Sequence, residues 1–451
     1  MKRSFSEYFK HEFETDFEVD SRRRLNRAGQ VQGIDVSGMD PEMGLSEAEM
    51  ETGYSLIREL KPNVLRIPDA DNERERWLEF AKTQMISPHL VISCEMDLTE
   101  AEHLAVDCLR RFGNSDVWSP SRFYEISADL YALSDEAKAE DVLSKTRKLA
   151  EIIKKTDPEG MIIIGGMFPN ASRWGQAKAV NQKLLENCGD VMDLFGVQVF
   201  PEPLNGKDWE DEKDGIEVNC RLAEEIGKTL VRLKNHISQV TGEDRINIAV
   251  NGWSFLRDDV RQKKQDGLYY ISVQNTLQKY AAWIPLAEAG PLFGNGGLLR
   301  REDGVVFGDV FYHSLLLSVP ALPVPLEIHE KDDGKKNPVY QWPGLPGSIE
   351  GGEIKMVEAS AAMSGDGKRL YLLVTNRSPY RRAVLHVRFR GFDKMHPAEA
   401  FVLSSKKRLD ENDAGNPTRV YCKAVKLRNY RKMDHVNLDI PQCSAVCMLL
   451  D

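Results

Sequence analysis

Short apolar runs alternate with longer amphipathic segments from about residue 30 to about residue 320. The runs are rich in Val, Ile and Leu, and they occupy 31–38, 63–68, 89–96, 122–127, 161–167, 192–200 and 246–253, with a weaker last one near 290–297. Between them, apolar residues recur at helical spacing, as in 46–60, 99–113 and 140–155. Unbroken apolar strands that alternate with helices indicate a parallel sheet covered on both faces. Eight such units over roughly 290 residues predict an α/β fold of the (β/α)8 TIM-barrel type.

A doubly wound open sheet is the competing arrangement, because it produces the same alternation of strands and helices. It is disfavoured because no GxGxxG motif follows the first apolar run. Periodicity alone does not separate the two folds.

The pattern changes after residue 320. Prolines and other turn residues are frequent from 319 to 353, and short alternating segments then follow at 354–364, 369–378, 383–392, 399–405 and 443–451. Short alternating strands separated by turn signals are typical of an antiparallel β-sandwich. We therefore expect an N-terminal arm over 1–28 that can join the sandwich, a barrel over 29–320 and a sandwich over 321–451.

Composition limits the classes of partner and the cellular compartment that we expect. The net charge of −10 is spread over 451 residues, which disfavours nucleic acid and anionic membrane as partners. The seven cysteines lie far apart without a CxxC pair, which favours reduced thiols and a cytoplasmic location. No apolar stretch suggests a signal peptide or a membrane span, and secretion stays open if a leader has been trimmed.

Chemistry in a TIM barrel belongs at the carboxyl ends of the strands. The fourth run ends in FYEISAD (123–129), and the seventh ends in IAVNGW (248–253). These two segments resemble the strand ends of glycoside hydrolase family 51, the α-L-arabinofuranosidases. Weaker likenesses occur in the same order along the chain, at 66–68, 99–108, 282–292, 357–360 and 374–378. The resemblance implies a barrel with a C-terminal sandwich, and it carries a faint expectation of a homo-oligomer.

The resemblance also implies where the catalytic carboxylates should be, and this sequence departs from it there. The general acid/base position falls on Asp129, one methylene shorter than the family's Glu, and the Asn before it is Ala128. The nucleophile position falls on Gly252, which has no side chain. On the sixth strand the family's His and Tyr are Gln198 and Phe200. A retaining glycosidase needs two carboxyl groups about 5–5.5 Å apart, so its mechanism is expected to be lost or altered.

The remaining candidate substrate-binding residues are Arg66, Glu125, Asn251 and Trp253, beside Ala128, Gln198 and Phe200. Each has a plainer interpretation. Arg66 pairs with Asp69 or Glu125, Asn251 and Gly252 form a turn, and Trp253 packs against its neighbours. Asp129 likewise serves as a cap for the loop after the fourth strand, and Gly252 has a further interpretation as an engineered replacement.

No metal or cofactor is expected. The nine histidines are scattered and lack HExxH or another metal-ligand spacing. The acidic, Trp-containing segment 202–214 is best explained as solvated surface. Glycine pairs at 165–166 and 296–297 lack the Lys-Ser/Thr sequel of a phosphate loop.

Three hypotheses follow for function. The first is a catalytically impaired or altered relative of the arabinofuranosidases that binds a carbohydrate or a protein partner. The second is an active glycosidase that uses Asp129 with a relocated carboxylate, for which Glu95, Asp69 and Glu202 are the candidates. The third is a structural subunit that uses the barrel as a rigid body, because a fold by itself assigns no function.

Overall fold

The computed structural model describes residues 12–25, 30–38, 44–69, 71–113, 120–169, 173–200, 212–254, 261–331, 337–345, 349–426 and 433–451. Within these ranges, eight parallel strands close into a barrel in chain order. The strands are β2 (Val31–Asp35), β3 (Val64–Ile67), β4 (Ser87–Ser93), β5 (Phe123–Ser127), β6 (Met161–Gly166), β7 (Leu194–Val199), β8 (Asn247–Trp253) and β9 (Leu286–Ala289). The predicted barrel is therefore confirmed.

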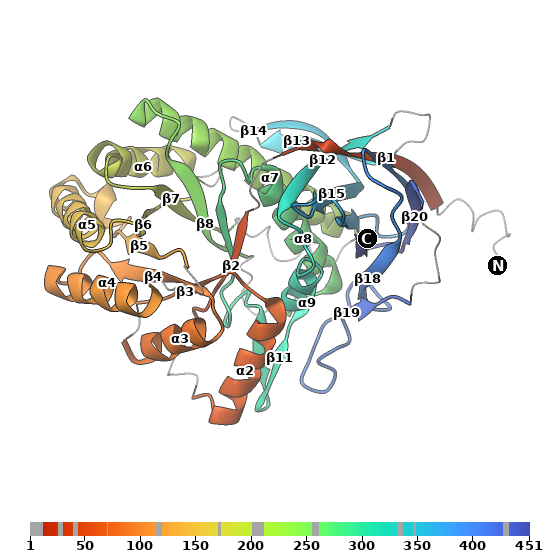
Figure 1. Ribbon diagram of the computed structural model, residues 1–451. Coiled ribbons are helices and arrows are strands. Elements are labelled where there is room, and N and C mark those ends of the chain that lie inside the picture. Colours follow the sequence, from red (N-terminus) through yellow and green to blue (C-terminus); the bar gives the residue numbers. More distant parts are fainter. Residues whose placement is uncertain are drawn as a thin grey trace.

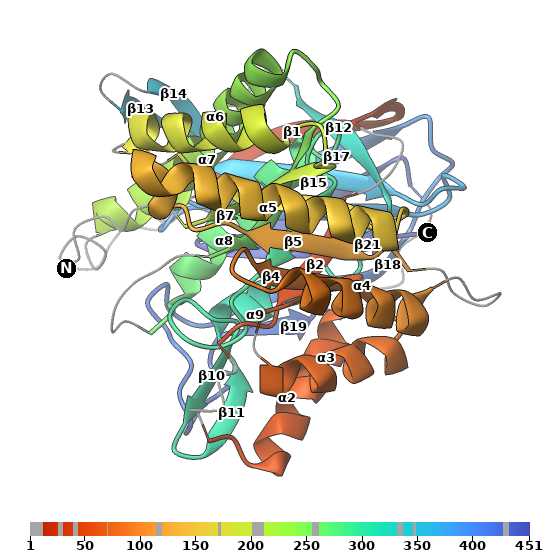
Figure 2. The same cartoon turned by 90° about the vertical axis from the view of Figure 1, so that its left-hand side faces the viewer.

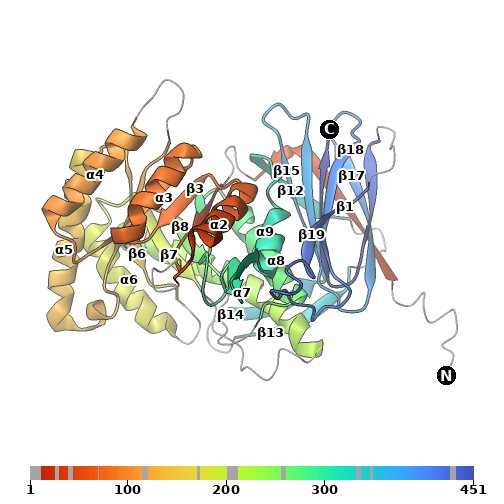
Figure 3. The ribbon, with the colours of Figure 1, turned by 90° about the horizontal axis from the view of Figure 1, so that it is seen from below.

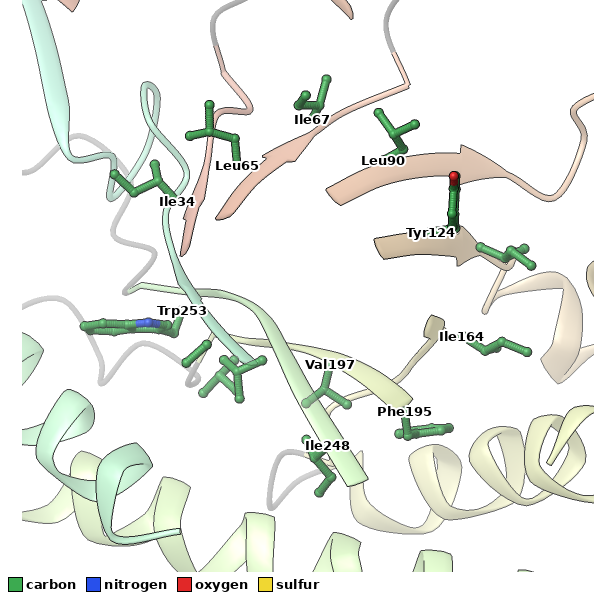
Figure 4. Packing of buried hydrophobic residues seen from close by; sticks show 14 of the residues in the cluster. Ile34, Leu65, Ile67, Leu90, Tyr124, Ile164, Phe195, Val197, Ile248 and Trp253 are labelled. Carbon is green, nitrogen blue, oxygen red and sulfur yellow. The ribbon is translucent and has the colours of Figure 1, made fainter. Parts of the chain in front are cut away.

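Helices cover the outside of the barrel (Figure 1). They are α2 (Glu47–Leu60), α3 (Asp71–Thr83), α4 (Leu98–Phe112), α5 (Glu136–Thr156), α6 (Trp174–Cys188), α7 (Glu212–Thr241) and α8 (Lys264–Lys279). Figure 2 shows α4, α5 and α6 lying side by side across the strands. Outward-facing side chains such as Phe195 and Ile248 fill the space between strands and helices (Figure 4). This shell holds the strand ends in fixed positions.

The eighth strand lies upstream of its predicted place. It was expected near 290–297, whereas β9 spans Leu286–Ala289 and residues 290–297 form the turns that follow. The strand was missed because its four residues, LAEA, include one large apolar side chain, whereas the runs predicted as strands are rich in Val, Ile and Leu.

The C-terminal part forms a second β-layered body beside the barrel, as Figure 3 shows. Its strands are β12 (Val324–Glu330), β15 (Val357–Met363), β16 (Leu370–Asn376), β17 (Arg382–Arg390), β18 (Pro397–Ser404), β19 (Tyr421–Ala424), β20 (His435–Ile440) and β21 (Ser444–Leu450). All adjacent pairs among these strands are antiparallel. This part is the predicted β-sandwich.

The first described strand, β1 (Glu12–Arg24), belongs to this same sheet. It pairs antiparallel with β12 and parallel with β17, so it lies between them. Phe13, Phe17 and Val19 are buried in the sandwich core. From Glu12 on, the chain thus runs first through the sandwich, then through the barrel, and then returns to the sandwich.

Two hairpins and a short helix join the two bodies. The hairpins are β10 (Leu299–Glu302) with β11 (Val305–Gly308), and β13 (Val339–Leu345) with β14 (Ile349–Lys355). The helix α9 (Val310–Leu316) lies with α8 between barrel and sandwich (Figure 3). Every residue of α8 from Lys264 to Leu277 is buried, because both bodies pack on this helix.

Candidate functional site

The barrel interior has an apolar floor and a polar layer above it. The floor is one cluster built by single residues from six strands: Val64, Phe123, Ile163, Leu194, Ala249 and Leu286. Residues two positions further along a strand face the same side. They are Arg66, Glu125, Gly165, Gly196, Asn251 and Glu288, from the same six strands. The side chains that follow the floor toward the barrel mouth are therefore polar or absent.

Arg66 connects two carboxylates in this layer. Its Nη1 lies 3.0 Å from Asp35 Oδ2, and its Nε donates to Glu125 Oε2 over 2.6 Å. All three residues are at most 5% exposed. Asp35 also accepts the backbone N–H of Ser37 over 3.0 Å. Because breaking such a buried pair leaves an uncompensated charge, Arg66 and Glu125 are firmly held by each other.

His89 extends the network across the barrel. Its Nδ1 lies 2.9 Å from both carboxylate oxygens of Glu288, and its Nε2 lies 3.3 Å from Glu125 Oε2. Burial alone lowers the pKa of His89, but Glu288 and Glu125 outweigh it and raise that pKa to about 9. Burial raises the pKa of Glu288 above its ordinary value, against the opposing effect of His89. The imidazole is thus a cation at neutral pH, clamped between two carboxyl groups.

Glu125 is held ionised by its partners. Burial alone raises its pKa, but Arg66 and His89 together bring that pKa well below its usual range. A general acid must carry a proton at working pH, and Glu125 does not. This carboxylate therefore serves as a counter-ion in the barrel wall.

Glycines on neighbouring strands make room for the polar layer. A Cβ at Gly33 would lie 2.6 Å from Glu288 Cγ, and one at Gly196 would lie 2.3 Å from Asn251 Nδ2. Real Cβ atoms do not approach other atoms so closely, so each glycine accommodates a polar side chain from the adjacent strand. The glycines and the buried polar residues are parts of one arrangement.

Gly252 sits in a bulge at the mouth. One residue of β7, between Val197 and Val199, stands opposite two of β8, between Val250 and Trp253, and the pairing of β8 with β9 shows the same mismatch. The φ of Gly252 is 154°, a backbone conformation that L side chains rarely adopt. The bulge and the missing side chain occur at the same residue.

The position that a Cβ would take at Gly252 lies next to three side chains. Asp35 Oδ2 is 3.5 Å away, Phe200 Cζ is 3.8 Å away and Gln198 Cγ is 3.9 Å away. Gln198 is exposed and Phe200 is half-buried. The structure thus brings together Gly252, Gln198 and Phe200, three of the residues predicted from the sequence, and it adds Asp35.

Asp129 is engaged by its own loop. Its exposed carboxylate Oδ1 accepts the backbone N–H of Tyr131 over 3.0 Å and that of Ala132 over 2.9 Å. These bonds cap the short turn η3 (Ala132–Ser134) that leads into α5. Ala128, just before it, is 8% exposed and packs into the barrel core.

Trp253 and Asn251 are both buried. The Trp253 indole is 2% exposed and packs on the ring of Tyr270, with 3.8 Å between centroids. Figure 4 shows it among the packed hydrophobic side chains. Asn251 is fully buried, and neither its Oδ1 nor its Nδ2 has a hydrogen-bond partner within the part of the chain that the structure describes.

The other candidate carboxylates have partners of their own. Asp69 pairs with Arg74 and accepts the Ser93 N–H over 3.1 Å, and Glu95 lies 2.9 Å from Lys145 Nζ. Glu202, with the rest of the acidic segment up to residue 211, lies outside the described residues.

Sequence reasoning missed Asp35, His89 and Glu288. Asp35 ends the first barrel strand, so its place at a strand's carboxyl end was a usable signal. His89 and Glu288 gave none, because a titratable residue inside a strand indicates no particular partner.

A separate cavity of about 570 Å³ lies at the other end of the barrel. It is lined by the starts of β2 and β3, from Gln30 to Ile34 and at Asn63, and by the linker at Leu322 and Pro323. It contains none of the site residues at the mouth.

No group of three or more His, Cys, Asp or Glu residues is arranged to hold a metal ion in the described ranges. The six cysteines described there are free thiols. In the same ranges, no helix has the length and apolar character needed to cross a membrane.

Comparison with solved structures identifies proteins of the same fold over almost the whole chain. An α-L-arabinofuranosidase from Thermotoga maritima, solved as an arabinose complex, superposes with a TM-score of 0.73 at 15% identity, covering 96% of this chain and 99% of that one. A family 51 α-L-arabinofuranosidase from Bifidobacterium longum gives 0.76 at 11% identity, with 97% and 100% covered. A family 44 xyloglucanase from Paenibacillus polymyxa gives 0.61 at 10% identity, with 97% and 99% covered.

No protein-family model matches the sequence, and no curated protein matches it. At identities of 10–15% the likeness establishes the architecture, a TIM barrel with a β-sandwich as in glycoside hydrolases of family 51. This likeness assigns no activity to the residues at the barrel mouth.

Proposed function

We propose that this chain, which shares the fold of the family 51 arabinofuranosidases, binds carbohydrate at its barrel mouth without hydrolysing it by double displacement. The observation that carries the proposal is Gly252. A retaining enzyme forms a glycosyl-enzyme bond with a carboxylate at the end of the seventh barrel strand, and a glycine supplies no oxygen for that bond.

The general acid/base position also departs from that of a retaining enzyme. Asp129 is a methylene shorter than Glu, and its Oδ1 already accepts two backbone N–H groups. A displacement of about 1 Å costs on the order of 10²-fold in rate. Catalytic groups that act as a unit lose most of their effect together, so the two changes favour binding over turnover.

Assays with aryl α-L-arabinofuranosides and arabino-oligosaccharides test the proposal. We expect no release of aglycone above the uncatalysed rate, and saturable binding of the oligosaccharides in titration calorimetry. Turnover that disappears in Asp129→Asn would overturn it, because that variant keeps the size of the side chain and removes only its acidic proton.

One observation favours a second candidate, an active glycosidase with a relocated nucleophile. Asp35 Oδ2 lies 3.5 Å from the position of the missing Cβ at Gly252, so a carboxylate already stands beside the vacant place. Its buried ion pair with Arg66 opposes this role, because an attacking oxygen has to leave that partner.

Trapping of a glycosyl-enzyme separates the two candidates. A 2-fluoro aryl glycoside, which slows breakdown of such an intermediate, should leave the protein unlabelled under the binding proposal. A label on the peptide that contains Asp35, absent in Asp35→Asn, would establish the relocated nucleophile.

We further propose a cytoplasmic location and a carbohydrate partner rather than nucleic acid or membrane. The support is an odd number of cysteines without a CxxC pair and a net charge of −10. Fractionation of the source cells, with the protein followed by antibody, tests the location.

A further inference from the structure

An exposed aromatic ring stands next to the acid/base position. Tyr131 is 77% exposed, more than the other large hydrophobic side chains exposed in the described ranges, of which Met85 at 63% comes next. It lies on the loop that leaves the carboxyl end of β5, the end of a TIM barrel where ligands bind. Its side chain contributes little to the core, and its ring is accessible to a ligand.

The turn that carries Tyr131 is fixed at both ends. The Asp129 carboxylate accepts the N–H groups of Tyr131 and Ala132, and the Asp129 carbonyl accepts the N–H of Leu133 over 3.0 Å. Leu133 is fully buried, and its own carbonyl accepts Lys183 Nζ of α6 over 2.8 Å. A ligand that contacts the ring therefore orders a side chain and no backbone, which lowers the entropic cost of binding.

We propose that Tyr131 is a stacking platform for a sugar ring and that Asp129 is the positioning residue that holds it. This inference rests on the proposed function and names the residue that would carry its affinity. A sugar ring presents an apolar C–H face that fits a flat aromatic surface, and its hydroxyl groups remain free for water and polar side chains. The carboxylate at the former acid/base position thus orients the turn that carries the ring.

The geometry separates this role from acid catalysis. A general acid donates a proton to the leaving oxygen, whereas Asp129 Oδ1 acts as an acceptor toward two N–H groups. An asparagine side chain also accepts N–H groups through its carbonyl and caps turns well, but it cannot act as an acid. Asp129→Asn therefore keeps the proposed role and removes the catalytic one.

The experiment is titration calorimetry of the full chain with arabino-oligosaccharides and xyloglucan oligosaccharides. We expect Tyr131→Ala to weaken binding at least tenfold and Tyr131→Phe to change it less than twofold. Asp129→Asn should also stay within twofold of the wild type, whereas Asp129→Ala should weaken binding about as much as Tyr131→Ala. Tyr380→Ala is the matched control, because Tyr380 is 45% exposed on the sandwich and should leave the affinity unchanged.

The outcomes test the proposed function and the stacking platform separately. If the wild type binds none of the oligosaccharides, the proposed function fails. If the wild type binds and Tyr131→Ala binds equally well, the proposed function stands and the platform is refuted. If Asp129→Asn loses affinity as Asp129→Ala does, the positioning role is refuted, and circular dichroism melts identify any variant whose loss comes from unfolding.

Discussion

At the residue scale, the missing side chain at position 252 is coupled to the backbone around it. The bulge in β8 sets φ of Gly252 to 154°, and Asp35 Oδ2 lies 3.5 Å from the Cβ position. A glutamate placed there would meet a strained conformation and a neighbouring carboxylate. The conformation of the strand therefore favours glycine at this position, and a glutamate substituted there would not have an unstrained place.

This coupling predicts the behaviour of Gly252→Glu. The variant should remain inactive toward aryl arabinofuranosides and should lose about 1–3 kcal/mol of unfolding free energy, because a side chain is forced into a disfavoured conformation. Gly252→Ala is the control that reports the backbone cost alone. Urea unfolding and aglycone release provide the measurements, and hydrolysis by a stable Gly252→Glu protein would contradict the expectation.

A second prediction concerns pH and His89. Its pKa in the folded protein is about 9, above the unfolded value of about 6.5, so its stabilising contribution is complete below about pH 6.5 and is lost as pH rises through about 9. We expect the unfolding free energy to fall by about 3 kcal/mol over that window. In Glu288→Gln the fall should be smaller, because the carboxylate nearest to the imidazole is gone. Urea titrations at pH 6.5 and 9.5 measure both, and equal losses in the two proteins would refute the role of the pair.

The residues of the site differed in how well they could be predicted from the sequence. Gly252, Gln198 and Phe200 were found because each sits at a strand end in a segment that resembles a known family, and the structure brings them together. His89 and Glu288 were not found, because their partnership depends on how β4 and β9 face each other across the closed barrel. Such a contact between residues 199 positions apart leaves no trace in local spacing.

At the element scale, the most informative strand is β1. It occupies an interior position of the sandwich sheet, with β12 on one side and β17 on the other. One side of the strand is buried at Phe17, which is 5% exposed, whereas Glu14 on the other side is exposed. β1 therefore contributes buried side chains to the sandwich core as well as hydrogen bonds to the sheet.

Truncation of Phe17 tests this contribution. Phe17→Ala should lower the unfolding free energy by about 3–5 kcal/mol, because a buried aromatic ring is removed and a cavity is left. Glu14→Ala, on the exposed side of the same strand, should stay within about 0.5 kcal/mol of the wild type. Urea unfolding followed by circular dichroism measures both. Equal effects would mean that β1 is not packed as described.

Strands and helices with a strong hydrophobic pattern were predicted well, and those with a weak pattern were not. The apolar run at 161–167 became β6 (Met161–Gly166), and the helical pattern at 46–60 became α2 (Glu47–Leu60). The eighth barrel strand was misplaced because hydrophobicity points to 292–293 rather than to the four residues that pair with β8 and β2. The position of that strand is set by closure of the barrel, which is a tertiary constraint.

At the scale of the whole molecule, α8 belongs to both bodies. Tyr270 and Val273 pack in the barrel core, whereas Leu268 and Ile271 pack against residues of the sandwich sheet such as Tyr371. A helix that is buried on all sides ties the two cores together. We infer that neither core stays intact when this helix is lost.

The shared helix predicts a single unfolding transition. Differential scanning calorimetry should show one peak whose calorimetric and van't Hoff enthalpies agree. Ile271→Ala should lower the midpoint of that whole peak, since truncation of a buried Ile costs about 2–5 kcal/mol. Val106→Ala, on the exposed face of α4, should leave the midpoint unchanged. Two resolved peaks, with only one displaced by Ile271→Ala, would show independent domains.

The place of β1 has a consequence for how the protein is made on the ribosome. This strand is synthesised before the barrel, but its two neighbours begin at residues 324 and 382. A strand with three large apolar side chains, Phe13, Phe17 and Val19, and with unpaired edges must therefore wait while the entire barrel is translated. Such edges can pair with other chains. Expression yield should depend on what covers the edges of β1 during synthesis, although β12 and β17 pair with both edges in the folded protein.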